Sequence, residues 1–262
     1  MQQSLLQFHA EMPGACVHNG REPWDLWGLA APYRPGDRFE DKVEATIGAL
    51  RLLIEAGHPL ILSTSWGKDS SVQLALALEA MQQVAAARRD AAGGSVLTEL
   101  PPMFVVTSNT GVENPLMDGY YHGESAKLEA YVQKQGIPVT VATARPSLSQ
   151  DYLVSLIGGR GIASMPGQDS KCSVDMKVTP LRKLKTKILK ATRHAQPAIS
   201  LIGKRWSESP DRKRRMIEAG ERPDQVIERE GELQLFPIAH FTEDDIFEFI
   251  GRVRAGMIAT YS

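Results

Sequence analysis

The sequence has only two cysteines, Cys16 and Cys172, among 262 residues. Two thiols do not make the disulfide framework of a small secreted protein. An ordinary iron–sulfur cluster needs four thiolates, so we expect no such cluster from this chain. The six histidines are scattered without the spacing of metal ligands, and none is assigned to a metal. The cysteine and histidine content therefore excludes a disulfide scaffold and gives no sign of a protein-bound metal centre.

Long apolar runs and an excess of charge are also missing. No apolar stretch approaches the roughly 18 residues that a membrane span needs, and the N-terminus lacks the basic-then-apolar pattern of a signal peptide. We therefore expect a cytoplasmic protein without a membrane partner. The formal net charge of −1 argues neither for nor against nucleic acid. The hydrophobic fraction of 42% is typical of a globular chain that buries a sizeable core.

The first 36 residues are rich in proline, glycine and tryptophan and show no sustained period. We expect residues 1–36 to form an irregular arm and residues 37–262 to form one domain. The arm is expected to pack on that domain through Trp24, Leu26, Trp27 and Tyr33. The pattern stops soon after Met257, which is compatible with a shortened C-terminus whose missing part carries DNA or partner binding.

Apolar periodicity predicts alternating strands and helices. Strands are expected at 60–64, 103–107, 138–142, 198–202 and 233–238, and helices at 38–56, 70–88, 116–135, 181–191 and 243–253. Residues 143–180 show no convincing regular element and are interpreted as a long functional or disordered loop. Successive strand–helix units predict an α/β fold with a doubly wound, mostly parallel five-stranded sheet and helices on both faces. In such sheets, ligands bind at the carboxyl ends of the strands.

The stretch with the clearest chemical meaning is LILSTSWGKDSS, residues 60–71. An apolar strand, a small polar turn and a helix start together present free backbone N–H groups and the positive end of the helix dipole to an anion. Gly67 lets the backbone approach a ligand, and Lys68 adds a charge. A Walker A loop is excluded because the positions that it requires hold Leu62 and Asp69. We interpret the stretch as a phosphate cradle made by Ser63, Thr64, Ser65, Trp66, Gly67, Lys68, Asp69, Ser70 and Ser71.

The run SWGKDS at residues 65–70 resembles the PP-loop of the ATP pyrophosphatases, with Trp66 in place of the first glycine of that motif. The resemblance implies cleavage of ATP between the α and β phosphates, which gives pyrophosphate and an adenylated acceptor. It implies ATP and Mg²⁺ as cofactors and catalytic roles for Lys68, Asp69 and Ser70. Asp69 either orients Mg²⁺ through water or caps the helix, and both readings stay open.

Four later stretches resemble motifs of the sulfonucleotide reductases and of DNA phosphorothioation proteins, and they occur along the chain in the same order as in those families. They are VTSNTGVENP at 106–115, KCSVDMKVTPL at 171–181, GKRWSESPDR at 203–212 and FPIAHFTEDDI at 236–246. The IGGRG run at 157–161 is most like the DndC and SspD types of bacterial DNA phosphorothioation protein. The resemblance identifies the chain as a PP-loop ATP pyrophosphatase of the PAPS reductase-like superfamily, with an adenine nucleotide α-hydrolase-like fold.

This resemblance also implies further contacts and a route for sulfur. Contacts to ATP or pyrophosphate are implied for Ser108, Asn109, Lys177, Arg205 and Arg212. Arg205 is also assigned a catalytic role, since a guanidinium suits a polyanion. Neighbouring Lys171 would lower the pKa of the Cys172 thiol, which could then accept a persulfide from a cysteine desulfurase. A packed structural cysteine is the open alternative for Cys172.

Two basic segments are candidate DNA contacts, the helix at 181–191 and the cluster at 213–215. Lys183, Lys187 and Arg214 are expected to touch backbone phosphates, and a solvated helix face is the alternative. The resemblance implies that a DNA phosphate is adenylated for sulfur incorporation. It also implies a cysteine desulfurase and other phosphorothioation proteins as partners, and it leaves a homodimer open.

Three classes of function follow. The first is an ATP pyrophosphatase of DNA phosphorothioation, a bacterial defence. The second is a sulfonucleotide (PAPS or APS) reductase or a relative of the small subunit of sulfate adenylyltransferase. A reductase needs a catalytic cysteine in a C-terminal tail, which this chain lacks, and the stretch at 172–180 weighs against the adenylyltransferase. The third is a nucleotide-binding assembly subunit without turnover, which an ATP-to-AMP assay would separate from the others.

Overall fold

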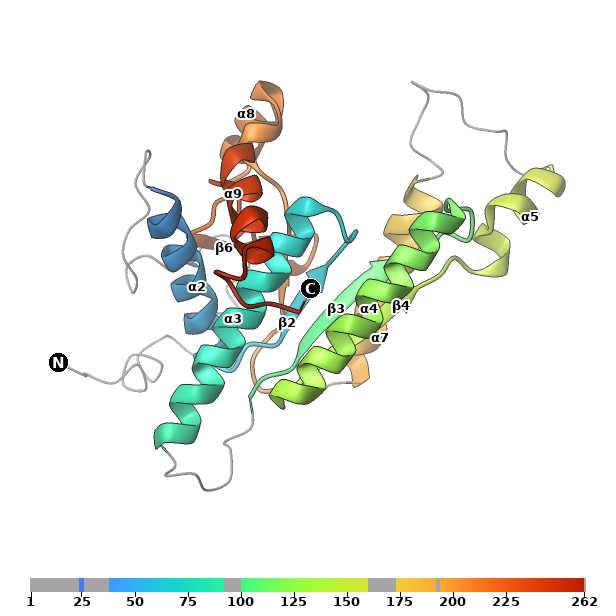
Figure 1. Ribbon diagram of the computed structural model, residues 1–262. Helices are drawn as coiled ribbons and strands as arrows, with labels where there is room; N and C mark the ends of the chain where they lie inside the picture. The colour runs from blue at the N-terminus through green and yellow to red at the C-terminus, as the bar shows by residue number, and fades with distance from the viewer. Residues whose placement is uncertain (1–23, 26–37, 92–99, 160–172, 192–193, 262) are drawn as a thin grey trace.

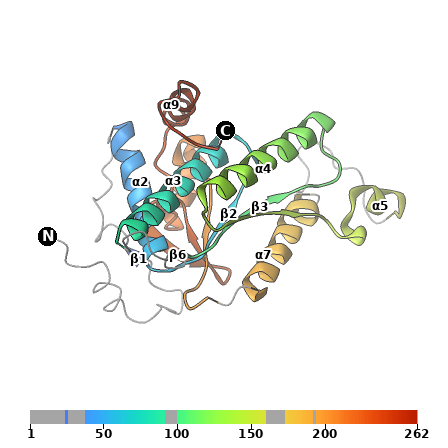
Figure 2. The same ribbon diagram turned by 60° about the horizontal axis from the view of Figure 1, so that its bottom comes forward.

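The computed structural model describes residues 24–25, 38–91, 100–159, 173–191 and 194–261. In this part of the chain one sheet is covered by helices on both faces (Figures 1 and 2). Its strands are β1 (Trp24–Asp25), β2 (Leu60–Ser63), β3 (Met103–Ser108), β4 (Val139–Ala144), β5 (Ile199–Leu201), β6 (Gln225–Arg229) and β7 (Glu232–Leu235). They lie in the order β1-β6-β7-β5-β2-β3-β4. All neighbours from β7 to β4 pair in parallel, whereas β6 is antiparallel to both β7 and β1.

Helices lie between the strands and after the last one, and several of them begin at residues whose side chains cap them. They are α2 (Phe39–Glu55), α3 (Lys68–Ala91), α4 (Pro115–Gln135), α5 (Tyr152–Ile157), α7 (Thr179–Ala191), α8 (Pro210–Glu218) and α9 (Glu243–Arg254). The Asn114 side chain caps α4 by accepting the Leu116 N–H. Thr242 and Asp245 form the capping box that starts α9, as the sequence predicted. Among the described helices, none combines the length and the apolar character that a bilayer crossing requires.

The central strands are buried on both faces, as a parallel sheet requires. Helices α2, α3, α4 and α9 lie on one face, and α7 lies on the other (Figures 1 and 2). Ile61, Phe104 and Val106 point to the α7 face, and their partners there are Leu181, Leu184 and Ile188. The basic helix α7 is therefore held to the sheet by one apolar side, which leaves its lysine-rich side facing outward.

The strand order places a crevice beside β2. The chain leaves β2 through α3 to reach β3 on one side, and β5 pairs with β2 on the other side. The loops after β2 and β5 both border this switch point, where doubly wound sheets bind ligands. The phosphate cradle predicted from the sequence follows β2 directly, and the GKRWSESPDR stretch follows β5.

The predicted fold class is confirmed, but the predicted number of five strands is wrong. Strand β6 was missed because Gln225–Arg229 (QVIER) is mostly polar and pairs through a tight hairpin rather than a βα unit. The hairpin turns at Glu230 and Gly231, whose φ values of 53° and 77° are both positive, as a primed two-residue turn needs. β1 is the second additional strand.

Two regions for which no helix was predicted contain helices. Residues 210–218 form α8, because the Ser209 side chain accepts the Arg212 N–H and Pro210 fits the first helical position. The long segment after β4 contains the 3-10 turn η1 (Leu148–Gln150), α5 and the π-helical turn η2 (Val174–Val178), which leads into α7. Of the predicted arm, Trp24 is described through the backbone of β1 alone. Leu26, Trp27, Tyr33 and Cys16 lie outside the described residues.

Candidate functional site

The loop between β2 and α3 is tied together by its own hydroxyl groups. The Ser70 hydroxyl donates to the Gly67 carbonyl at 3.0 Å and receives a hydrogen bond from Thr64 Oγ1 at 3.3 Å. Thr64 Oγ1 also accepts the Trp66 N–H at 2.9 Å. These contacts turn the chain sharply into α3, so the N–H groups of its first turn face the carboxyl edge of the sheet. The resulting positive helix end suits an anion.

A cavity of about 500 Å³ opens over this loop, and we call it the PP-loop cavity. Ten of the residues predicted to bind nucleotide line it: Ser63, Thr64, Ser65, Gly67, Lys68, Asp69, Ser70, Ser108, Lys177 and Arg212. Glu208 also lines it, together with three residues that sequence reasoning missed: Lys204, Glu113 and Tyr121. Lys204 directly precedes Arg205 in the GKRWSESPDR stretch, so that stretch was the sequence signal that could have identified Lys204.

Four predicted nucleotide contacts do not line the PP-loop cavity. Trp66 and Ser71 line a neighbouring cavity of about 580 Å³, and Asn109 lines a third one of about 470 Å³. Asn109 accepts the Gly111 N–H at 2.9 Å and donates to Asp118 Oδ1 at 2.8 Å. Its amide therefore organises the β3–α4 loop. Arg205 is the fourth of these residues.

Arg205 is 4% exposed and points at Asp69 in the first turn of α3. Its Nε lies 3.0 Å from Asp69 Oδ1 without hydrogen-bond geometry, and its Nη2 donates to Oδ2 at 3.4 Å. Nη1 donates to Ser207 Oγ at 2.7 Å. The guanidinium therefore joins the loop after β5 to the PP-loop.

The Lys68 ammonium is turned toward α9. It forms an ion pair with Glu243, the first residue of that helix, and lies 4.9 Å from the centroid of the Phe247 ring. The same ammonium lowers the pKa of the Glu243 carboxyl below its usual value. Lys68 borders the PP-loop cavity, so its flexible side chain could reach a phosphate only by leaving Glu243.

The other cations of the PP-loop cavity are also paired with carboxylates. Arg212 contacts Glu208, and Lys177 Nζ lies 3.8 Å from Glu113 Oε1. Lys204 Nζ lies 3.4 Å from Glu221. Such partly exposed pairs are weak, so a polyphosphate could compete with the carboxylates for these cations.

The Mg²⁺ implied by the PP-loop motif can be weighed against the donors present. Asp69 supplies a carboxylate at the helix start, but both of its oxygens face Arg205. Within the described ranges, no group of three or more histidine, cysteine or acidic residues is arranged to hold a metal ion. The donor set therefore fits a Mg²⁺ carried mainly by the phosphates of a nucleotide rather than by ligands of the chain.

The predicted DNA contacts lie on two helices that both start at the PP-loop cavity. Lys177 of η2 and Leu181 of α7 line the cavity, and Lys183 and Lys187 follow along α7. Arg212 lines it on α8, two residues before Arg214. Lys183 donates to Gln150 at 3.1 Å, and Arg214 lies 3.5 Å from Asp211. Cys172, the candidate persulfide acceptor, lies outside the described residues.

Comparison with known proteins covers the same region. The family described as the phosphoadenosine phosphosulfate reductase domain matches residues 59–258, a range that contains β2 through α9. The chain is similar in structure to FMN adenylyltransferase of Candida glabrata, with 11% identity and a TM-score of 0.42 over 84% of this chain and 59% of that one. It is also similar to the U34-tRNA thiolase NcsA of Methanococcus maripaludis, with 14% identity and a TM-score of 0.42 over 81% of this chain and 64% of that one. A third similar structure is NAD+ synthetase of Burkholderia pseudomallei, with 16% identity and a TM-score of 0.46 over 87% of this chain and 70% of that one.

The chain spans between 59% and 70% of the length of these three structures. No curated protein sequence matches it.

Proposed function

Because the chain belongs to the phosphoadenosine phosphosulfate reductase domain family, we propose that it is an ATP pyrophosphatase that adenylates a DNA backbone phosphate for sulfur incorporation. One observation carries the proposal: the PP-loop cavity combines a helix N-terminus and serine hydroxyls on one wall with Lys177, Lys204 and Arg212 on the others. That arrangement suits the polyphosphate of a nucleotide.

The first step is an adenylyl transfer. A non-bridging oxygen of a DNA backbone phosphate attacks the α-phosphorus of ATP. The bond from that phosphorus to the oxygen shared with the β-phosphate breaks, and pyrophosphate leaves with the bonding electrons. The N–H groups at the start of α3, with the Ser65 hydroxyl, bind the leaving oxygens, and the Ser70 hydroxyl holds the loop in place through the Gly67 carbonyl. When bound with the nucleotide, Mg²⁺ neutralises the charge that builds up on the pyrophosphate.

The second step replaces AMP by sulfur. The terminal sulfur of a persulfide, supplied by a cysteine desulfurase, attacks the activated backbone phosphorus and AMP leaves. A thiol then cleaves the sulfur–sulfur bond, is itself oxidised to a disulfide and leaves a phosphorothioate on the DNA. Cys172 is the residue of this chain proposed to carry the persulfide, and other phosphorothioation proteins are the proposed partners.

The layout of the basic helices supports DNA as the acceptor. α7 and α8 both begin at the PP-loop cavity and carry lysines and arginines away from it. A duplex lying along α7 would bring one backbone phosphate to the cavity while Lys183 and Lys187 contact others. Lys185 is not available for this, because it is buried and paired with Glu232 at 3.2 Å.

The test measures pyrophosphate release from Mg-ATP with duplex DNA, with sulfate, with a sulfonucleotide and with no acceptor. DNA is expected to stimulate release, and the Lys183→Ala/Lys187→Ala double variant should lose this stimulation and lower the salt slope of DNA binding by about one per lysine. Lys134→Ala, an exposed lysine on α4, is the matched control. Stimulation by sulfate or by a sulfonucleotide instead of DNA would replace this proposal with the corresponding sulfur-assimilation activity.

A further inference from the structure

Trp66 has an unusual backbone conformation for a bulky residue. Its φ is +56°, and among the described residues Glu230 is the other non-glycine residue with positive φ. A large side chain is disfavoured in this left-handed region, so the surrounding structure must hold it there. Trp66 lies inside the PP-loop, and in the sequence it stands between Thr64 and Ser70, whose hydroxyls are hydrogen-bonded to each other. Whatever holds Trp66 therefore also fixes the loop that faces the phosphates.

The contacts of Trp66 come from three separate parts of the chain. Its N–H is bound by Thr64 Oγ1 at 2.9 Å within the loop. Its carbonyl accepts a hydrogen bond from the Tyr120 hydroxyl of α4 at 3.4 Å. Its indole ring packs edge-on against the Tyr261 ring, with centroids 6.4 Å apart and planes at 65°. This edge-to-face geometry is favourable for aromatic pairs.

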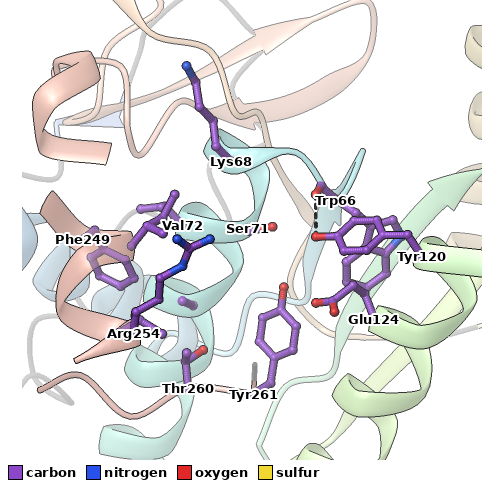
Figure 3. A pocket seen from close by; sticks show the side chains of 13 residues that line it. Trp66, Lys68, Ser71, Val72, Tyr120, Glu124, Phe249, Arg254, Thr260 and Tyr261 are labelled. Carbon is purple, nitrogen blue, oxygen red and sulfur yellow. Dashed lines mark hydrogen bonds between the residues drawn. The ribbon is translucent and has the colours of Figure 1, made fainter. Parts of the chain in front are cut away.

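The side chain of Trp66 points away from the PP-loop cavity. It is 3% exposed and lines the neighbouring cavity together with Tyr120 and Tyr261 (Figure 3). Figure 3 shows the Tyr120 hydroxyl joined to the Trp66 carbonyl by a dashed line, and Tyr261 on the segment after α9 with its hydroxyl toward Ser71. Trp66 is therefore part of the PP-loop backbone, while its ring is anchored in the neighbouring cavity.

We propose that Tyr120 and Tyr261 are positioning residues that clamp Trp66 from behind and so hold the PP-loop in its phosphate-binding shape. In this chain, the tryptophan ring and its two tyrosine partners do what a glycine would do by backbone freedom alone. For catalysis the inference rests on the proposed ATP pyrophosphatase function. The clamp itself is a property of the ligand-free loop and can be measured without turnover.

Two measurements are needed, and the first is hydrogen exchange of the backbone amides at residues 66–69 in the ligand-free protein. Tyr261→Ala should speed this exchange because the indole loses its packing partner, whereas Tyr261→Phe, which keeps the ring, should not. Tyr120→Phe should also speed it, since the Trp66 carbonyl loses its donor. Tyr131→Phe is the matched control, because that tyrosine is also on α4 but is hydrogen-bonded to Gln82, away from the loop.

The second measurement is kcat/KM for pyrophosphate release. Tyr261→Ala should lower it by about tenfold to a hundredfold, the scale of a misplaced catalytic loop. Adding Trp66→Gly to Tyr261→Ala should recover part of the loss, because glycine adopts a positive φ without an anchor. A merely structural role for Tyr261 would give no such rescue.

The outcomes separate the clamp from the proposed function. Unchanged exchange at 66–69 in both Tyr261→Ala and Tyr120→Phe would overturn the clamp, whatever the enzyme does with ATP. Faster exchange in the two variants, combined with a wild-type protein that never releases pyrophosphate, would keep the clamp and remove the proposed function. If Tyr261→Ala fails to fold, Tyr120→Phe carries the test alone, since it removes one partly exposed hydroxyl.

Discussion

Arg205 and Asp69, 136 residues apart in sequence, form an ion pair that links the loop after β5 to the first turn of α3. The guanidinium is almost fully buried, and the carboxylate is the one acidic group in that turn. The pair therefore fixes the two loops at the switch point of the sheet, on which the PP-loop cavity depends. Arg205 acts in the ligand-free protein as a brace, and a direct contact with phosphate would require it to leave Asp69.

Removing the carboxylate of this pair should be costly. Asp69→Ala leaves a buried, uncompensated guanidinium, and we expect the free energy of unfolding to fall by about 3–5 kcal/mol. Urea denaturation measures this. Arg214→Ala is the comparison, because it breaks the exposed contact with Asp211 and should change stability by less than about 0.5 kcal/mol. Equal stability of the two variants would show that the buried pair has no structural role.

Freeing Lys68 should improve nucleotide binding. Glu243→Ala removes its partner, so the ammonium no longer has to leave an ion pair to reach a phosphate, and the KM for ATP should fall about two- to fivefold. Steady-state kinetics measures this. Asp244→Ala controls for the loss of an acidic residue from the first turn of α9. A KM that rises in Glu243→Ala would mean that the glutamate helps to bind the nucleotide.

Gly203 is confined by the buried side chain of Gln73. A Cβ at Gly203 would lie 2.5 Å from Gln73 Oε1, and Gln73 is fully buried. Gly203→Ala should therefore destabilise the fold by about 1–3 kcal/mol. Gly48→Ala should instead stabilise it by about 0.5–1 kcal/mol, because Gly48 lies within α2 and nothing stands within 4 Å of its Cβ position. Denaturation of both variants tests the opposite signs.

Tyr261 should titrate late and make stability fall at high pH. Burial, with smaller contributions from Glu124 and Tyr120, raises its pKa from 10.0 to about 12, although a hydrogen bond with Ser71 opposes the rise. The unfolded chain loses this proton first, so the stability that Tyr261 contributes is complete below pH 10 and is lost as the pH rises toward 12. Ultraviolet titration should show late tyrosinate formation whose last step Tyr261→Phe removes, since burial also raises the pKa values of Tyr120 and Tyr121. Identical titration curves for the two proteins would contradict this.

The sequence predicted the elements that have a strong local signal. The apolar run before Ser63 and the periodic helix after Lys68 predicted the β2–α3 unit, and Thr242 with Asp245 predicted the start of α9. Helix α8 was missed because its sequence, PDRKRRMIE, is mostly charged and Met216 is its one buried side chain. With so few apolar residues, no period of 3.6 is visible.

Pairings within the candidate site could not be predicted in the same way. Arg205 was expected to face phosphate because of its motif, yet its partner is set by the register of β5 against β2, which brings the two loops together. Lys68 meets Glu243 because α9 packs beside α3, 175 residues away in the chain. The anchoring of Trp66 by Tyr261 likewise depends on where the segment after α9 returns to the fold.

The most direct test of the account is the position at which the protein cleaves ATP. Purified protein would be incubated with Mg-ATP and duplex DNA, and the products of the wild type would be compared with those of Ser70→Ala and of the control Ser155→Ala. The account predicts AMP and pyrophosphate from the wild type and the control. For Ser70→Ala it predicts a rate lower by about a hundredfold, because the PP-loop loses its tie to the Gly67 carbonyl and with it the placement of the N–H groups at the start of α3. ADP and phosphate, or a wild-type rate in Ser70→Ala, would contradict it.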